Sequence, residues 1–125
     1  MKSLRALLTT ALSILTLQRT ATVTGATVDM ANFASNKAVF VPGVLTDGVH
    51  TPSVTESDAA ASGFTAVAAA DLDGALAVLA SNVPQSVGYI GSKRYLRLVI
   101  TTTGGPATGL NAGAHVEQGN SRKVP

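Results

Sequence analysis

The stretch Val87–Gly105, VGYIGSKRYLRLVITTTGG, has the clearest strand pattern in the chain. From Tyr95 to Thr101 the residues alternate as in a half-buried β-strand, and three aliphatic side chains share one face. They are Leu96, Leu98 and Ile100. Before this strand, the segment 91–94 (GSKR) interrupts an apolar run and predicts a hairpin connection or a tight corner. The sequence therefore predicts a β domain with residues 95–101 as its central strand.

The composition favours a single domain that works within an assembly. The 125 residues suffice for one hydrophobic core. The absence of cysteine excludes a disulfide framework and thiolate chemistry. A net charge of +2 is too small to indicate a specific nucleic-acid partner, which needs a clustered basic face. Only 13% of the residues are charged, so partner surfaces are expected to cover part of this mostly apolar chain.

The pattern in the middle of the chain predicts short strands joined by turns. Turn signals occur at 46–48 (TDG) and 104–106 (GGP), and Asn82-Val83-Pro84 ends a segment, 71–80, that allows one or two helical turns. Because Pro42 cannot donate to a ladder, the strand within 37–45 is expected to be bulged or at an edge. We expect a mainly β chain, with a single antiparallel β-sandwich or jelly-roll-like domain over 20–119 and a C-terminal tail over 120–125.

Residues 1–19 are predicted to form an N-terminal Leu-rich arm or a short helix. Apolar residues recur in this segment at helical spacing. They are Leu4, Leu7, Leu8, Ala11, Leu12 and Leu15. Lys2 and Arg5 before an apolar run also fit a secretory signal peptide, but four hydroxyl residues dilute that run and no A-x-A site follows. The run ends at Gln18, too soon for a membrane span of about 20 residues.

No catalytic or cofactor motif stands out in the sequence. His50 and His115 are the only histidines, and they lie too far apart to give metal-ligand spacing. There is no G-x-S-x-G elbow, and no G-K-[ST] follows Gly104 as a phosphate loop requires. Asp71-Leu72-Asp73-Gly74 lacks the further oxygen ligands of a calcium loop. We therefore expect a protein that is not an enzyme and holds neither a metal nor a cofactor.

The one basic cluster consists of Lys93, Arg94 and Arg97, with Tyr89 and Tyr95 interleaved. Such a cluster can bind a phosphate backbone or an acidic protein surface, or it can form a solvated turn and an outward-facing strand. We favour a third role, in which arginines on the outer face of the central strand pair with carboxylates of a neighbouring strand or subunit. Arg94 and Arg97 are thus candidates for polar contacts with a partner.

Four segments together resemble small structural proteins that are encoded among the head genes of tailed bacteriophages. These segments are VTGATVDM (23–30), VLTDGVHTPSVTESD (44–58), FTAVAAADLDGA (64–75) and VGYIGSKRYLRLVITTTGG (87–105). The resemblance covers about Val23 to Lys123, and similar proteins often begin with a Leu-rich arm and end in a short basic tail. It implies a virion component, a capsid decoration (cement) protein of β-sandwich type that often trimerises.

As a decoration protein the chain would bind the major capsid protein on the capsid surface and stabilise the shell. Leu4, Leu8, Leu12 and Leu15 are then the expected anchors, since each buried leucine contributes about 1.5–3 kcal/mol. One alternative is a head–tail connector or a tail structural protein. Another alternative is a carbohydrate-binding jelly-roll module, because KRYLRLVI (93–100) looks like a late strand of discoidin-type modules. Such modules usually expose aromatic residues, which make up only 4% of this chain.

Overall fold

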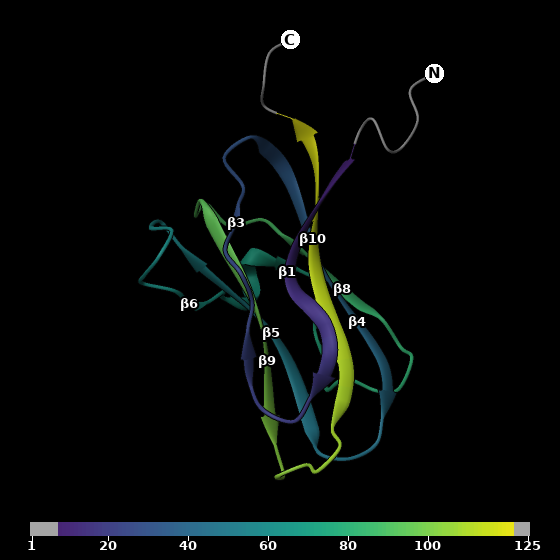
Figure 1. The fold of residues 1–125 in the computed structure, drawn as a ribbon. Helices are drawn as coiled ribbons and strands as arrows, with labels where there is room; N and C mark the ends of the chain where they lie inside the picture. Colours follow the sequence, from purple (N-terminus) through teal and green to yellow (C-terminus); the bar gives the residue numbers. More distant parts are fainter. Residues whose placement is uncertain (1–7, 122–125) are drawn as a thin grey trace, which may run out of the picture.

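The computed structural model describes residues 8–121 and contains two antiparallel sheets, packed face to face as a β-sandwich (Figure 1). Sheet A has the order β1 (Leu8–Arg19), β10 (Leu110–Ser121), β4 (Phe33–Leu45), β8 (Gln85–Tyr89), β7 (Leu72–Asp73). Sheet B has the order β2 (Val23–Thr24), β9 (Tyr95–Thr103), β5 (Val49–Ser57), β6 (Thr65–Ala66), and β3 (Val28–Asp29) also pairs with β9. A 3-10 turn, Ala69–Asp71, precedes β7. The predicted mainly β architecture is confirmed.

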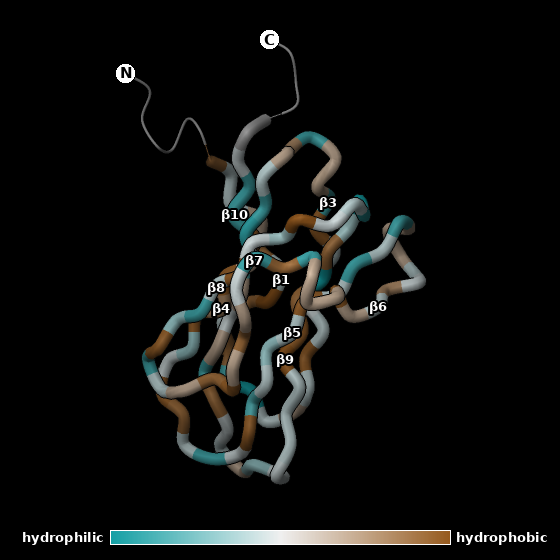
Figure 2. Tube along the Cα trace, turned by 180° about the vertical axis from the view of Figure 1, so that it is seen from behind, coloured by the Kyte–Doolittle hydropathy of each residue, from teal (hydrophilic) through white to brown (hydrophobic). Residues whose placement is uncertain are grey.

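The predicted central strand is confirmed as β9. It lies between β5 on one side and the short strands β2 and β3 on the other. Leu96, Leu98 and Ile100 are all 0% exposed and face sheet A. The segment 91–94 is a corner rather than a hairpin turn, because it carries the chain from β8 in sheet A to β9 in sheet B. Hydrophobic and hydrophilic residues alternate along these strands, as the hydropathy colouring of Figure 2 shows from behind.

The helical interpretation of the N-terminal segment is wrong over Leu8–Arg19, which forms the 12-residue strand β1. This strand pairs with β10 along its whole length, from Leu8 opposite Gly119 to Arg19 opposite Leu110. Two irregularities in the register, on either side of Ile14, interrupt the alternation of side chains. Because of these irregularities, leucines at the spacing of a helix are exposed on a strand whose backbone is extended. Residues 1–7, and Leu4 with them, lie outside the described residues, as do 122–125 of the tail.

Pro42 lies in a strand that is central at one end and an edge at the other. β4 pairs with β10 on one side, and its pairing with β8 on the other side covers only Asn36–Phe40. Pro42 therefore lies where β4 has no partner on the β8 side, and a strand edge tolerates a residue without an N–H donor. The ladder with β10 is irregular where Ala112 faces Pro42. The expected bulge and edge are both present, but only beyond Phe40.

The core between the sheets holds mostly aliphatic side chains together with a few polar groups that bind one another. Its largest fully buried side chain is Phe40. Gln118, which is 3% exposed, donates its amide to Asn36 Oδ1 at 3.0 Å and to the Asp29 carbonyl at 3.1 Å. Asn36 in turn donates to the Phe33 carbonyl at 3.3 Å. This buried amide pair satisfies polar atoms at the end of the sandwich near the β3–β4 turn.

Asp47 and His50 join the two connections that cross between the sheets at the other end. Asp47, between β4 and β5, accepts hydrogen bonds from the backbone N–H groups of the loop 107–109 between β9 and β10. His50 is 0% exposed, with Nδ1 3.0 Å from Thr102 Oγ1 and Nε2 3.1 Å from the Asp47 carbonyl. A carbonyl only accepts, so Nε2 carries the proton. The histidine is a structural residue of this end.

Candidate docking surfaces

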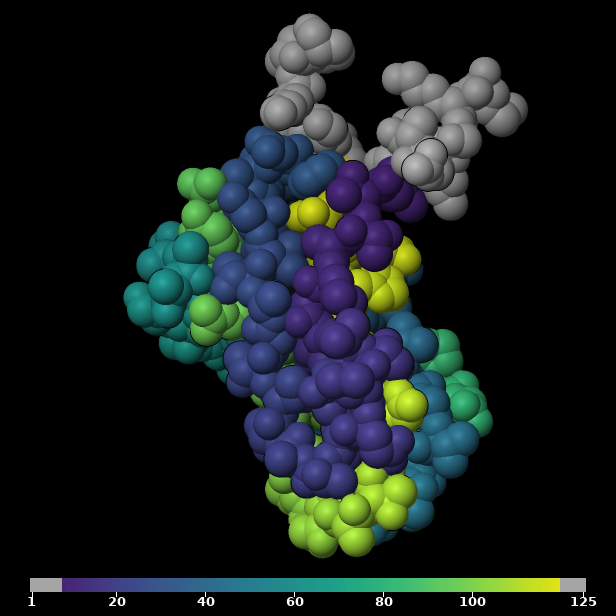
Figure 3. Space-filling model, in the orientation of Figure 1, coloured from purple at the N-terminus to yellow at the C-terminus, as the bar shows by residue number. Residues whose placement is uncertain are grey.

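Four leucines of β1 form an exposed ridge along one edge of the sandwich. Their residue exposures are 38% for Leu8, 57% for Leu12, 57% for Leu15 and 50% for Leu17. In Figure 3, β1 and the segment that follows it run down the front of the molecule. We call these four residues the β1 ridge. Three of the four predicted anchors thus stand on one exposed strand, and the fourth, Leu4, lies outside the described residues.

The ridge points outward because the middle of β1 is anchored inward. Ile14 is 1% exposed, and the buried Ser13 bridges the two sheets. Its hydroxyl donates to the Ala26 carbonyl at 2.9 Å and accepts from the Leu98 N–H at 3.2 Å. A Cβ on Gly25 would collide with Ser13, so glycine is required at that crossing. With Ser13 and Ile14 facing the core, Leu12 and Leu15 on either side are exposed.

The outer face of sheet A continues the apolar surface beyond the ridge. The strand registers place residues of β10 and β4 side by side in rows: Glu117 beside Lys37, His115 beside Val39, and Gly113 beside Val41. Val41 is 43% exposed, and Val39 is half-buried. The charges on these rows are one ion pair, Lys37 Nζ to Glu117 Oε2 at 3.8 Å, with His115 Nε2 3.5 Å from Glu117 Oε1. We call these rows the central face of sheet A.

The outer face of sheet B carries mostly hydroxyl groups, although Val49, which is 44% exposed, lies at its end opposite Thr103. Here Thr51 pairs with Thr101, Ser53 with Val99, and Thr55 with Arg97. The Thr55 hydroxyl also donates to the Arg97 carbonyl at 2.9 Å. Threonine is β-branched and suits a strand, and its hydroxyl is readily hydrated. We call this surface the hydroxyl face, and its chemistry is that of a face turned to solvent.

The two predicted arginines lie on the sheet B side and bind groups of their own chain. Arg94 holds Asp29 with two hydrogen bonds, from Nε at 3.0 Å and from Nη2 at 2.9 Å. Arg97 donates from Nε to Thr27 Oγ1 at 2.8 Å and lies 4.1 Å above the centre of the Phe64 ring. The described part of the chain shows no carboxylate paired with Arg97. These arginines are not brought together with the β1 ridge.

The remaining basic side chain of the cluster is also paired. Lys93 Nζ lies 2.8 Å from Asp58 Oδ2, and the hydrogen bond from this ammonium group raises the Lys93 pKa. The hydrogen bond from Arg94 lowers the pKa of Asp29 and raises that of Arg94. Each pair is solvent-exposed, so its contribution to stability is small. A basic patch open to an anionic partner is therefore not what these three residues form.

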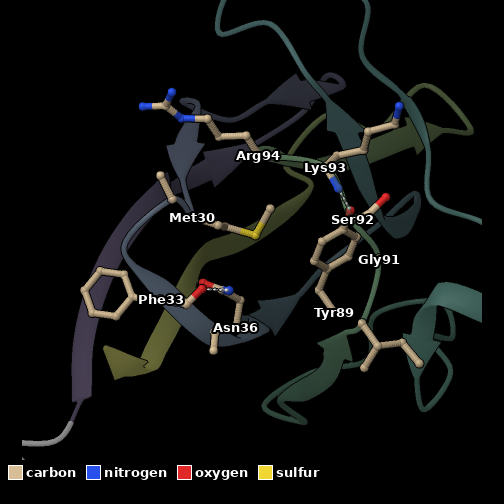
Figure 4. A pocket seen from close by; sticks show the side chains of 11 residues that line it. Met30, Phe33, Asn36, Tyr89, Gly91, Ser92, Lys93 and Arg94 are labelled. Atoms are coloured by element: carbon tan, nitrogen blue, oxygen red, sulfur yellow. Dashed lines mark hydrogen bonds between the residues drawn. The ribbon is translucent and has the colours of Figure 1, made fainter. Parts of the chain in front are cut away.

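A cavity of about 470 Å³ opens at the end of the sandwich where the β3–β4 turn meets the corner 91–94. Met30 and Tyr89 face each other across it, with Phe33 and Asn36 beside them (Figure 4). The polar groups at its wall bind one another: the Tyr89 hydroxyl donates to Glu56 Oε1 at 2.6 Å and accepts from the Lys93 N–H at 3.0 Å. Burial and Glu56 together raise the Tyr89 pKa far above its usual value. The cavity offers apolar contact and no free charge.

The described residues, 8–121, contain no cluster of three or more residues suited to hold a metal ion. Within the same range, no helix is both long and apolar enough to cross a membrane. Comparison with protein-family models, curated proteins and solved structures gave no match to this chain.

Sequence reasoning did not find the central face of sheet A or the cavity. The face is formed by β4 and β10, which are far apart in sequence, and its rows depend on a register that only the structure gives. One signal was present, since Val39 and Val41 alternate with the buried Ala38 and Phe40. That alternation marks a strand with apolar residues on both faces, which is unusual for a surface that meets water.

Proposed function

We propose that this chain is a non-enzymatic structural subunit of a virus particle, a decoration protein that binds the major capsid protein on the outer surface of the shell. Two lines support the proposal. One is the resemblance of residues 23–123 to small phage head proteins. The other is the division of the surface into an apolar side and a hydroxyl side. A subunit of this kind needs a rigid scaffold and a contact surface rather than a cleft.

The observation that carries the proposal is the β1 ridge. Leu12 and Leu15 are each 57% exposed on a strand without a charged residue between Leu8 and Gln18. A long uncharged edge strand is an aggregation hazard in a free protein, and natural edges are usually protected by charges or by a covering partner. A hydrophobic ridge of this length is explained when a partner covers it in the native assembly. Many weak contacts of this kind on a lattice give a strong attachment.

The proposal is tested on tailed-phage particles whose genome carries this gene and from which the gene has been deleted. The purified chain is added back, and occupancy is measured by quantitative gel analysis and immunogold labelling. We expect label over the shell. The double variant Leu12→Asp/Leu15→Asp is expected to lose at least tenfold in occupancy, because two carboxylates would then be buried in the contact with the shell. The matched control, Thr51→Asp/Thr101→Asp, places the same charges on the hydroxyl face and should bind as the wild type does.

Three results separate the alternatives. Label at the neck or along the tail would move the protein to a connector or tail station and overturn its role as a decoration protein. No binding of the folded wild-type chain to any part of the particle would overturn the virion role altogether. Equal occupancy by both double variants would refute the role of the β1 ridge.

A further inference from the structure

We propose that the central face of sheet A is a two-fold contact with a second copy of this chain. This inference deepens the proposed function, on which it rests for its setting, because it names the partner of a surface next to the β1 ridge. Its basis is the register of β4 and β10, the exposure of the valines and the arrangement of charge.

The valines of this face are not needed to make the strand. Threonine has a comparable preference for strands, and the hydroxyl face of sheet B uses it at the equivalent outward positions, such as Thr51 and Thr101. On β4 the outward positions are Val39 and Val41, the second of them 43% exposed. The middle rows of the sheet B face thus carry mainly hydroxyl groups, with Val99 among them and Val49, 44% exposed, at its end, whereas both outward β4 positions of the central rows carry methyl groups. Strand propensity does not explain this difference in the middle rows, and a covering partner would account for it.

The charges on this face match those of its own copy. Lys37 and Glu117 are neighbours in one row across the β4–β10 boundary, with side-chain exposures of 52% and 37%. A two-fold axis parallel to the strands and midway between β4 and β10 exchanges these two strands between copies. It therefore sets Lys37 of each copy against Glu117 of the other, and no like charges meet in that row. A surface that carries one cation and one anion on either side of such an axis is self-complementary.

The neighbouring rows are compatible with the same axis. It sets Val39 of one copy against His115 of the other, which brings a methyl surface onto an imidazole ring. In the next row it sets Val41 against Gly113, over which Thr16 of the same copy lies. Three successive rows thus contain an ion pair, a contact of valine with an imidazole ring and a contact of valine with a threonine side chain. The contact is two-fold, which differs from the trimer that the sequence resemblance implies.

The size of the face sets the expected strength. The three rows span about 15 Å along the strands and are the middle of a larger outer face formed by β10, β4 and the five residues of β8. That whole face covers roughly 450 Å². A standard interface buries about 800 Å² on each partner, so this contact is at the weak end and a micromolar Kd is expected. On a particle surface, where copies are held side by side, such a contact is sufficient to pair them.

The experiment is sedimentation equilibrium of the purified chain from about 1 µM to about 1 mM, a range that brackets a micromolar Kd. We expect a monomer–dimer equilibrium. Val41→Lys should raise the Kd at least tenfold, whereas Thr101→Lys, the same change on the hydroxyl face, should leave it unchanged. Circular dichroism melting curves establish that both variants are folded. A wild-type monomer throughout this range, a wild-type trimer, or equal effects of the two lysines would overturn the proposal.

Charge exchange gives a second, independent test. Lys37→Glu alone and Glu117→Lys alone each place like charges across the axis and should dissociate the dimer. One variant then presents two acidic side chains in this row and the other two basic ones, so their equimolar mixture should form a heterodimer. An ion pair that acts only within one chain gives no such rescue, because each chain keeps its own like-charged pair. A mixture that stays monomeric would therefore refute the contact.

These results are separable from those on the particle. Dimerisation in solution without binding to particles would overturn the proposed function and leave the two-fold contact standing. Binding to the shell by a chain that stays monomeric in solution and unpaired on the particle would support the proposed function and overturn this inference.

Discussion

The outer faces of the two sheets lie on opposite sides of one core and differ in the groups that they present. On sheet B, Thr51 and Thr101 stand opposite each other, whereas on sheet A the central rows carry Val39 and Val41. Both choices satisfy the strand equally well, since threonine and valine are both β-branched. Strand propensity therefore does not account for the difference. Under the proposals above, sheet B faces water, and sheet A together with the β1 ridge contacts other proteins.

The largest expected effect comes from removing the core that both faces share. Leu98→Ala should reduce the free energy of unfolding by about 2–5 kcal/mol, because the 0% exposed side chain leaves a cavity between the sheets. Urea denaturation followed by circular dichroism measures it. The next residue, Val99, lies on the hydroxyl face, and Val99→Ala should cost much less. Similar losses at both positions would contradict the assignment of the two sides of β9.

The next largest loss in the free energy of unfolding should come from the buried amide pair, Gln118 and Asn36. Gln118→Leu removes the donor to Asn36 Oδ1 and to the Asp29 carbonyl, and buried acceptors without a partner cost about 1–3 kcal/mol. The control is Gln18→Leu on the exposed strand β1 of the same sheet, where a change within about 0.5 kcal/mol is expected. Equal losses in urea denaturation would show that burial does not distinguish the two glutamines.

Acid should lower the stability that Asp47 provides by joining the β4–β5 and β9–β10 connections. The hydrogen bond from the Gly109 N–H, then that from Ala107, hold the pKa of Asp47 below its usual value of about 3.9. Its carboxylate therefore stabilises the fold fully above that value, and the contribution is lost as the pH falls through the lower pKa of the folded state. Melting temperatures from pH 7 to pH 2 should fall more steeply for the wild type than for Asp47→Asn. Parallel curves would rule out this role.

The smallest effect on stability should come from exchanging the chemistry of the faces. Val39→Thr/Val41→Thr and, conversely, Thr51→Val/Thr101→Val should each change stability by no more than about 0.5 kcal/mol per position. Fluorescence of a dye that binds apolar surface should fall for the first variant and rise for the second. A large loss of stability in the first variant would mean that the valines serve the fold itself, and the comparison of the faces would fail.

The sequence predicted the sandwich where local pattern and tertiary structure agree. The alternation of Leu96, Leu98 and Ile100 needs no knowledge of other strands, so β9 was predicted correctly. Turn residues such as Gly48, with φ of 83°, also act locally. The candidate anchors Leu8, Leu12 and Leu15 were chosen because apolar residues recur along the N-terminal segment, and the structure places them on one strand with exposures of 38–57%. Their role as partner contacts stays a prediction.

The strand β1 could not be predicted because its pattern is misleading. The leucines are three and four residues apart, which is the spacing of a helix, and leucine is a good helix former. The irregular register around Ile14 allows leucines at this spacing to be exposed on an extended strand. Pairing with β10 over 12 residues outweighs that preference. Thr9, Thr10 and Thr16 were the available signal, since β-branched residues favour strands. Deleting residues 2–17 would therefore remove a strand of sheet A as well as the ridge, and point substitutions are the cleaner test.

The pairing of the first and last strands has a mechanical consequence. β1 and β10 are antiparallel neighbours, with Leu8 opposite Gly119, so the described chain enters and leaves at the same end of the sandwich (Figure 1). A force applied between those two ends peels β1 from β10 one residue pair at a time and never loads the whole ladder in shear. The fold therefore resists tension between its two described ends poorly.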